Sequence, residues 1–405
     1  MTATPRPTAR PVETRTPELP PLQARRPHGL LRVALEVAVL GAVAFAALEL
    51  ATRLEDRVRF GTPVMSNFTD QADLIVNDRD GMHGRPNARF RKFVLNNHGF
   101  RGPDITEVPA PGHRRIFAVG ASETFGLGES PGREYPRQLE DSLGARDGLR
   151  RQLGIERFEV VNGAMLGMSL PTLTQNVRAR LARYRPSYVV AYPTPVQYLM
   201  DHRPVAAVPD STVVTVPEPS FHLRVLPRLQ EQVKLMLPGT IATRLRARDI
   251  AKSIREHPAG WVLAAVPEDR VTAYDEDLRA LVGAIRAIGA EPVLMAHVNV
   301  FSDDEPRDTK LLTAWRRFYP RASGDVLIAF DRRLRTVTCR VAADSGVTLV
   351  DVEPFLASPR AQWFADYSHF SDRGAGLVSG LVARAIEARA LGTAPPAAGA
   401  ACMNS

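Results

Sequence analysis

Three residues of types that support nucleophilic catalysis lie in two distant parts of this chain of 405 residues. Ser122 follows a short apolar run, and Asp366 precedes His369 by three positions near the other end of the chain. A serine hydroxyl is a weak nucleophile until a base removes its proton, and the base needs a third group to hold its tautomer and stabilise its positive charge. The pattern therefore predicts that one short C-terminal segment supplies both base and orienting acid to Ser122.

The residues around Ser122 predict where this serine lies in the fold. Ile116–Val119 is a short uncharged apolar run typical of a buried strand, and it ends at Gly120. A helical pattern follows near residues 135–143. Such a strand, glycine turn and helix place the serine at the carboxyl end of a strand, where open α/β sheets bind ligands. The G-x-S-x-G elbow of α/β-hydrolases is absent, because Thr124 occupies its second glycine position.

At these positions the chain resembles the SGNH/GDSL hydrolase family. Three segments match that family's blocks in the correct order, over roughly residues 90–390: Gly120-Ala-Ser-Glu-Thr-Phe-Gly126, Val160-Val-Asn-Gly-Ala-Met-Leu-Gly-Met-Ser169 and Asp366-Tyr-Ser-His369. The resemblance implies a three-layer α/β/α sandwich of flavodoxin-like type with a parallel sheet of about five strands. It also implies that Ser122, Asp366 and His369 are catalytic, and that the backbone of Gly167 helps to bind the oxyanion.

Two positions depart from the family pattern. Ala121 replaces the usual aspartate before the serine, and no asparagine follows the strand-like run 187–192, where the family places an oxyanion donor. Thr194 or Gln197 could donate instead, or the backbone N–H groups of Ser122 and Gly167 could act alone. Losing one oxyanion donor typically lowers kcat by about 10²–10³-fold. A slow or inactive enzyme therefore stays open.

Polar residues also follow a second strand-like run and are further site candidates. His297 and Asn299 follow the strand-like run 292–297, so they are candidates for substrate contact at the same rim of the sheet, or else residues satisfied at a strand end. The sequence contains no HExxH, no CxxC and no clustered histidine pair, so we expect no metal site and no cofactor.

The N-terminal region predicts a membrane location. Residues 1–29 are rich in Pro, Thr and Arg and are typical of a disordered basic tail. Residues 30–52 form an apolar segment near the length that crosses a bilayer. Arginines before it predict a cytoplasmic N-terminus, and no clean cleavage site follows. We expect a single-pass signal anchor in the cytoplasmic membrane with the catalytic domain outside; the alternative is a helix of the globular domain.

The rest of the chain divides by composition. We expect a loop-rich lead-in at 53–113, a catalytic domain at 114–390 with an insertion at 201–272, and a disordered tail at 391–405. The insertion is basic and amphipathic, which fits either a cap or membrane-facing lobe or a solvated helical face. Asp325–Phe330 reads as a strand. The two cysteines, Cys339 and Cys402, predict no disulfide framework. The net charge of +8 comes partly from the tail, so it predicts no nucleic-acid partner.

These features and the resemblance to membrane-anchored family members imply a serine esterase. Its expected substrate is a small acyl ester, such as O-acetyl, on an envelope or extracellular glycan. An acyltransferase using the same serine is an alternative, because both reactions share the acyl-enzyme. A catalytically weak or inactive glycan-binding assembly protein is another, favoured by Ala121 and the missing asparagine. A lipid-active hydrolase is a third, favoured by the basic insertion.

Overall fold

The computed structural model describes residues 28–393 apart from 79, 203, 206–218 and 220–221, together with Cys402. It forms two compact units, Met1–Leu50 and Ala51–Ser405. The tails predicted at 1–29 and 391–405 lie almost entirely outside the described residues. The other predicted divisions of the chain stay predictions.

The first unit consists of most of helix α1, His28–Phe60. Its 33 residues span about 50 Å at 1.5 Å per residue, more than the roughly 30 Å of a bilayer core. The stretch Leu31–Phe60 has a mean hydropathy of 2.1 in its most apolar window. Among the described residues this is the one helix long and apolar enough to cross a membrane.

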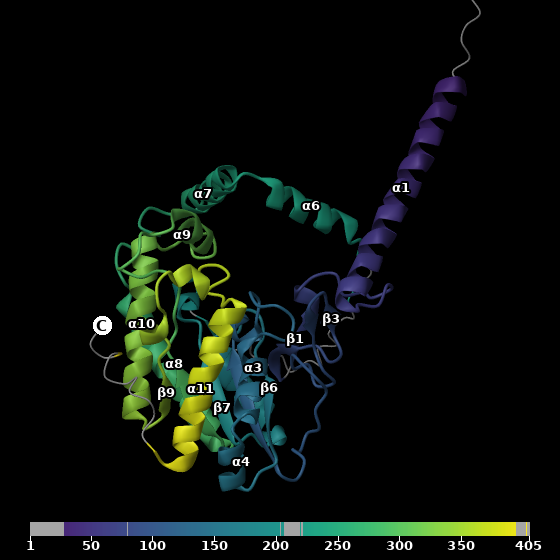
Figure 1. The fold of residues 1–405 in the computed structure, drawn as a ribbon. Helices are drawn as coiled ribbons and strands as arrows, with labels where there is room; N and C mark the ends of the chain where they lie inside the picture. The colour runs from purple at the N-terminus through teal and green to yellow at the C-terminus, as the bar shows by residue number, and fades with distance from the viewer. Residues whose placement is uncertain are drawn as a thin grey trace, which may run out of the picture. The chain divides into compact units, whose positions relative to one another are not determined.

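The second unit is built on a five-stranded parallel sheet (Figure 1). In spatial order its strands are β6 (Arg157–Asn162), β5 (His113–Gly120), β7 (Tyr188–Tyr192), β8 (Glu291–Met295) and β9 (Thr348–Val350). This is the flavodoxin-like order 2-1-3-4-5, which confirms the expected fold class. The chain reverses direction across the sheet beside β5, so the carboxyl end of β5 lies at the topological switch point.

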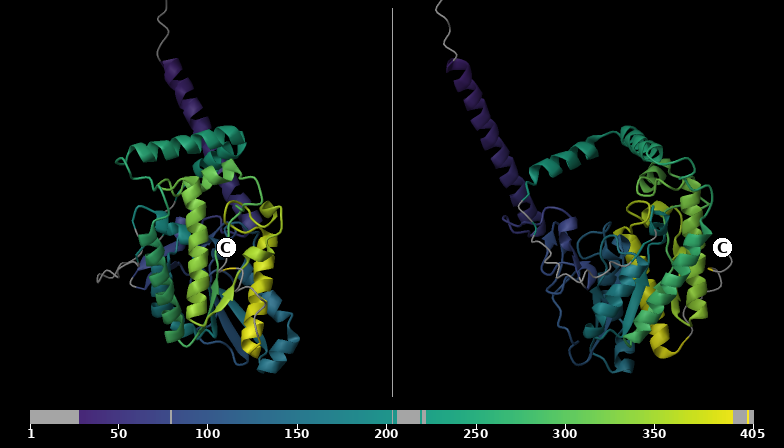
Figure 2. Two further views of the ribbon diagram at one scale, coloured as in Figure 1. Left: turned by 90° about the vertical axis from the view of Figure 1, so that its left-hand side faces the viewer. Right: turned by 180° about the vertical axis from the view of Figure 1, so that it is seen from behind.

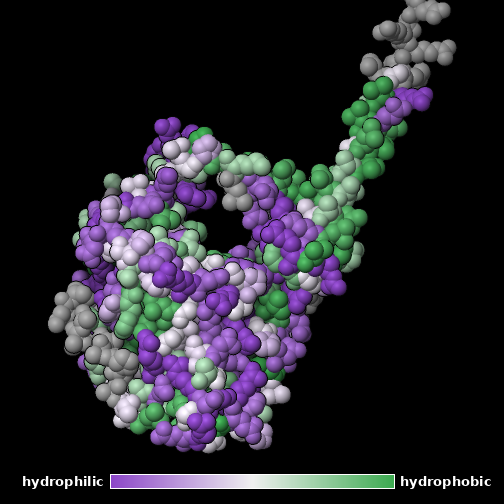
Figure 3. Space-filling model, viewed as in Figure 1, coloured by the Kyte–Doolittle hydropathy of each residue, from purple (hydrophilic) through white to green (hydrophobic). Residues whose placement is uncertain are grey.

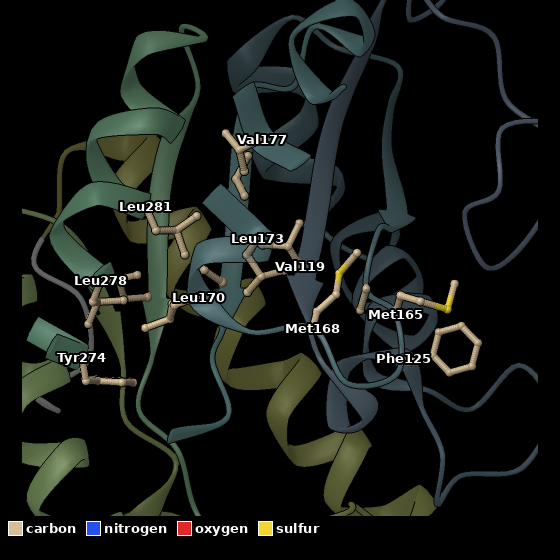
Figure 4. Close-up of a cluster of buried hydrophobic side chains, with 14 of the residues drawn as sticks. Val119, Phe125, Met165, Met168, Leu170, Leu173, Val177, Tyr274, Leu278 and Leu281 are labelled. Carbon is tan, nitrogen blue, oxygen red and sulfur yellow. The ribbon is translucent and has the colours of Figure 1, made fainter. Parts of the chain in front are cut away.

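Alternating side chains of β5 divide the core between two helical layers. Ile116 and Ala118 face one apolar cluster, and Phe117 and Val119 face the other. The first cluster includes residues of α3 (Tyr135–Gly144), α4 (Asp147–Leu153) and α11 (Asp372–Leu391). The second includes residues of α5 (Leu170–Ala179), α8 (Glu268–Ala287) and α10 (Gly324–Asp344). Figure 2 shows the sheet between these layers, and Figure 4 shows part of the second cluster around Val119. Strands buried on both faces are apolar, as β7 and the second half of β5, residues 116–120, are.

Two sequence predictions were wrong. Asp325–Phe330 lies in α10 and is not a strand; its buried residues Val326, Leu327 and Phe330 follow helical spacing. Cys339 and Cys402 form a disulfide, with their Cα atoms 6.1 Å apart, although no disulfide was expected. The wide separation of 63 residues along the chain gave no local signal for this pairing.

Short elements complete the unit. Before the sheet come the 3-10 turn η1 (Ala72–Leu74) and two small antiparallel hairpins. The first hairpin pairs β1 (Ile75–Asp78) with β2 (Gly81–Gly84), and the second pairs β3 (Arg89–Phe90) with β4 (Phe93–Val94). Helices α6 and α7 lie between β7 and α8, and α9 lies between β8 and α10: Val225–Met236, Gly239–Arg255 and Thr309–Arg316. The remaining short helices are α2 (Ser122–Phe125), η2 (Leu181–Tyr184), η3 (Pro195–Leu199), η4 (Glu353–Phe355) and η5 (Arg360–Gln362).

Candidate active site

Ser122 lies at the carboxyl end of β5, as its sequence context predicts. It is the first residue of α2, directly after β5 and Ala121. Gly120 is required there, because a Cβ atom at this position would come within 2.6 Å of the Tyr192 carbonyl oxygen. Gly126 ends α2 with φ +91°, a left-handed conformation that side-chain-bearing residues rarely adopt. Two glycines thus form the tight turn that presents the serine at the switch point.

The structure brings Ser122, His369 and Asp366 together. The Nε2 atom of His369 lies 2.9 Å from the Ser122 Oγ, and its Nδ1 lies 2.8 Å from Oδ2 of Asp366. Oδ1 of Asp366 accepts the backbone N–H groups of Ser368 and His369 at 3.0 and 2.9 Å. The aspartate therefore fixes both the imidazole and the loop that carries it. Sequence spacing predicted this convergence.

Electrostatics at the triad favour a charged pair. Burial alone would raise the pKa of Asp366, but its hydrogen bond with His369 and the histidine charge outweigh burial and lower that pKa. Burial alone would lower the pKa of His369, yet Asp366 and the negative charge of Glu123 bring it above its ordinary value. The site therefore stabilises the imidazolium that forms when the serine proton is removed.

Glu123 is a site residue that the sequence did not reveal. Its side chain is buried, and its carboxylate accepts hydrogen bonds from the hydroxyls of Thr194 at 2.8 Å and Ser368 at 3.3 Å, while the Ser122 Oγ lies 3.4 Å away. These three residues come from three different chain segments. Burial would raise the pKa of Glu123, but His297 and His369 outweigh it and lower the pKa to about 2. Glu123 thus connects the three segments as a buried anion. The one sequence feature that could have indicated this role is that Glu123 directly follows Ser122.

His297 and Asn299, the candidates for substrate contact or for residues satisfied at a strand end, are both buried. His297 lies with Nε2 3.9 Å from Oε1 of Glu123 and Nδ1 2.8 Å from Oδ1 of Asp331. Asn299 donates to the other oxygen of Asp331 at 2.7 Å. Burial would lower the pKa of His297, but the two carboxylates raise it to about 10. His297 is therefore a buried cation between two anions. His297 and Asn299 also line a pocket with Asp331, and their role toward a substrate stays a prediction.

The predicted oxyanion groups lie at one pocket. Gly167, Thr194 and Gln197 line it together with Ser122. Gly167 is exposed and has φ +77°, a conformation that favours glycine. The single hydroxyl proton of Thr194 is directed at Glu123, so this hydroxyl would have to rotate to serve an oxyanion. The oxyanion roles of Gly167, Thr194 and Gln197 stay proposals.

The pocket itself has a volume of about 600 Å³ and is lined by groups of two kinds. Its apolar wall is largely aromatic: Trp315, Phe318, Tyr319 and Tyr367. Two arginines, Arg246 of the inserted helix α7 and Arg317 after α9, also line it. The serine therefore lies in a pocket able to enclose a ring-sized ligand group, with part of the wall supplied by the insertion.

The lead-in segment buttresses the turn that holds the serine. The guanidinium of Arg101 is buried and donates to the carbonyl oxygens of Phe125 and Gly126 at the end of α2. Asn162, at the end of β6, donates to the Thr124 carbonyl at 3.0 Å. These bonds satisfy α2 carbonyls that have no intrahelical partner. Nothing in the composition of the lead-in predicted this role for Arg101.

Within the described residues, no group of three His, Cys, Asp or Glu side chains is arranged to hold a metal ion.

Comparison with known proteins gives likeness of fold at low identity. No protein-family model matches the chain, and no curated protein matches it. Solved structures similar to it include an acetyl xylan esterase from Geobacillus stearothermophilus (16% identity, TM-score 0.38, covering 71% of this chain and 97% of that one). Another is a lipase/acylhydrolase from Enterococcus faecalis (16% identity, TM-score 0.37, covering 70% of this chain and 100% of that one). A third is a GDSL-like lipase from Bacteroides thetaiotaomicron (12% identity, TM-score 0.34, covering 70% of this chain and 93% of that one). They agree with the SGNH/GDSL resemblance of the motifs, but at these values the likeness carries no argument about the reaction of this chain.

Proposed function

We propose that this chain is a serine esterase of the SGNH type acting on small acyl esters. The observation that supports it best is the continuous hydrogen-bonded series from the Ser122 hydroxyl through His369 to Asp366 at the floor of an open pocket. A serine in an ordinary turn needs no buried histidine and carboxylate aligned behind it. The geometry matches the requirements of an activated nucleophile.

The proposed reaction follows from these contacts. The Ser122 Oγ attacks the ester carbonyl carbon while Nε2 of His369 takes its proton, and Asp366 stabilises the resulting imidazolium. The backbone N–H groups of Ser122 and Gly167 bind the oxyanion. His369 then protonates the leaving alcohol, and a water molecule, activated by the same histidine, releases the acid from the serine. Atoms and charges balance in both halves without a cofactor.

The proposed substrate is an O-acyl group, such as acetyl, on an envelope or extracellular glycan. The aromatic wall of Trp315, Phe318 and Tyr367 supports this, since aromatic faces pack against the apolar faces of sugar rings. The same acyl-enzyme would serve an acyltransferase if a sugar hydroxyl replaced water. Adding a glycan acceptor to the assay separates the two, because a transferase would form acylated glycan in place of free acid.

Hydrolysis of p-nitrophenyl acetate by the full-length protein tests the proposal. Ser122→Ala should lower kcat/KM at least about 10³-fold. Ser130→Ala is the matched control, because the Ser130 residue is exposed and should leave the rate unchanged. Slow cleavage of p-nitrophenyl palmitate relative to acetate would exclude a lipid-active enzyme. Absence of Ser122-dependent hydrolysis for every small ester would refute the esterase and favour a glycan-binding protein.

We further propose that α1 anchors the protein in the cytoplasmic membrane with the catalytic unit outside. Arginines precede the apolar segment, and the positive-inside tendency then places the N-terminus in the cytoplasm. A C-terminal alkaline phosphatase fusion should be active and a green fluorescent protein fusion dim. The opposite pattern would refute this orientation.

A further inference from the structure

Helix α6 (Val225–Met236) carries an apolar face that the other described residues leave uncovered. Leu226, Leu229, Val233 and Met236 are 51%, 58%, 51% and 79% exposed. At about 100° per residue, these four positions fall within about 80° of the helix circumference. Figure 3 shows apolar side chains along this helix. Contiguous exposed apolar surface of this kind marks an interaction site more often than an ordinary solvent face.

The opposite face of α6 is the one that holds it to the catalytic unit. Arg224, the N-cap, and Arg228 both bind Asp56, with N–O distances of 2.8 and 2.6 Å. Glu231 pairs with Arg91 at 2.6 Å. Arg224, Arg228 and Glu231 lie on the side of the helix away from the leucines. The polar contacts therefore turn the apolar face outward from the domain.

Chain connectivity keeps the start of α6 close to the proposed membrane span. Asp56 comes four residues after position 52, where the expected apolar segment ends. Even a fully extended chain covers only about 14 Å in four residues. Since Arg224 and Arg228 bind Asp56, the first turn of α6 cannot lie far from the point where the chain leaves the bilayer. A lipid surface is thus within reach of the apolar face.

The neighbouring helix carries charge of the sign that a bacterial-type anionic bilayer attracts. Arg244, Arg248, Lys252 and Arg255 of α7 are all exposed. Each basic side chain near an anionic leaflet contributes about 1 kcal/mol of attraction. Membrane binding grows with buried apolar area and with electrostatic attraction to anionic lipid; α6 supplies the apolar area, and α7 supplies the positive charge.

We propose that α6 docks on the surface of the same bilayer that α1 crosses, with Leu226, Leu229, Val233 and Met236 inserted at the boundary between headgroups and acyl chains. The inference rests on the proposed anchor and goes beyond the proposed esterase. Because α7 follows α6 directly and contributes Arg246 to the pocket, docking would hold that side of the pocket at the membrane surface.

Site-directed fluorescence in proteoliposomes tests this proposal. The full-length protein carries one introduced cysteine with an environment-sensitive nitrobenzoxadiazole label, since Cys339 and Cys402 are bonded to each other. Val233→Cys reports on α6, and Val39→Cys reports on the apolar segment of α1. Arg151→Cys on α4 is the control, because α4 and α6 lie at opposite ends of the catalytic unit in Figures 1 and 2.

Vesicles of phosphatidylethanolamine and phosphatidylglycerol are compared with the same vesicles containing nitroxide-labelled lipid. We expect the labels at 233 and 39 to lose most of their fluorescence to the nitroxide, and the label at 151 to keep it. Leu226→Gln with Leu229→Gln should restore fluorescence at 233 alone.

Three results would overturn the proposal. Quenching at 39 without quenching at 233 would show an anchored protein whose α6 stays in water. No quenching at either position would show that the anchor itself is wrong. If the fluorescence of the label at 233 changes with protein concentration but does not depend on nitroxide lipid, a second copy of the chain covers the apolar face. Hydrolysis of p-nitrophenyl acetate, measured on each labelled sample, reports separately on the proposed esterase.

Discussion

Replacing Glu123 by glutamine tests whether the buried charges behind the serine stabilise the fold as a connected set. The substitution keeps the size of the side chain and removes its negative charge. His297, a cation with no exposed side-chain surface, would then keep only Asp331 as its charged partner. Removing one member of a buried ion pair costs about 3–5 kcal/mol, because the remaining charge is left uncompensated. Since Asp331 remains 2.8 Å away, we expect a loss of about 2–4 kcal/mol for Glu123→Gln.

The distance between the partners sets how strongly two substitutions should interact. Two unit charges about 4 Å apart attract by about 4 kcal/mol at an effective dielectric constant near 20, and Nε2 of His297 lies 3.9 Å from Glu123. Measured coupling energies of contacting residues are about 0.5–3 kcal/mol. The double variant Glu123→Gln/His297→Gln should therefore be about 1–3 kcal/mol more stable than the sum of the two single losses predicts.

Thermal unfolding of the full-length protein in detergent gives the assay, with apparent Tm read from intrinsic fluorescence. The single variants should lose about 4–8 °C at roughly 2 °C per kcal/mol for a domain of this size. A matched control combines Glu123→Gln with Glu387→Gln; Glu387 lies on α11 and forms a partly exposed ion pair with Arg146, the N-cap of α4. That pair should be additive to within about 0.5 kcal/mol. Additivity of Glu123→Gln with His297→Gln would refute the buried charge set.

Three further results are expected from the same geometry. Burial raises the pKa of Glu129 to about 8, so the folded protein favours the neutral side chain and becomes less stable as pH rises from 4.5 to 8, where the unfolded chain is ionised. The apparent Tm of Glu129→Gln should therefore rise by a few degrees relative to the parent as pH rises through that window. Gly167→Ala should lower kcat by about 10–10³-fold with little change in KM, because it disturbs an oxyanion N–H at φ +77°, whereas Thr194→Val should do so only if the Thr194 hydroxyl leaves Glu123. The raised pKa of His369 requires kcat/KM to fall on acidification at a pH above that of an ordinary histidine, and a limb at or below pH 6.5 would contradict it.

The sequence predicted features whose causes are local. An uncharged apolar run ending in Gly120 predicts a buried strand and a turn, and the order of the motif segments predicts that Ser122 and His369 meet. The boundaries of β5 and α11 follow from the same runs, with Ser371 capping α11 through its side chain.

Features that depend on distant contacts were not predictable from one sequence. Nothing in the sequence marks Glu123 as buried; Thr194 reaches it from the segment after β7, and Ser368 from the loop before α11. Asp331 follows a stretch whose apolar residues fit a short strand as well as a helix; in the fold this stretch lies in α10, which packs mainly against α8 and η3. Arg101 becomes a structural residue only because β6 ends beside it.

Covalent labelling of the serine tests the central proposal most directly. The full-length protein is treated with a fluorophosphonate, which reacts with an activated serine hydroxyl, and the modified peptide is identified by mass spectrometry. We expect one adduct, on Ser122, with labelling slowed at least about 10²-fold in His369→Ala because the general base is lost. Labelling of another serine, or equal rates in the parent and His369→Ala, would contradict a catalytic Ser122–His369 pair.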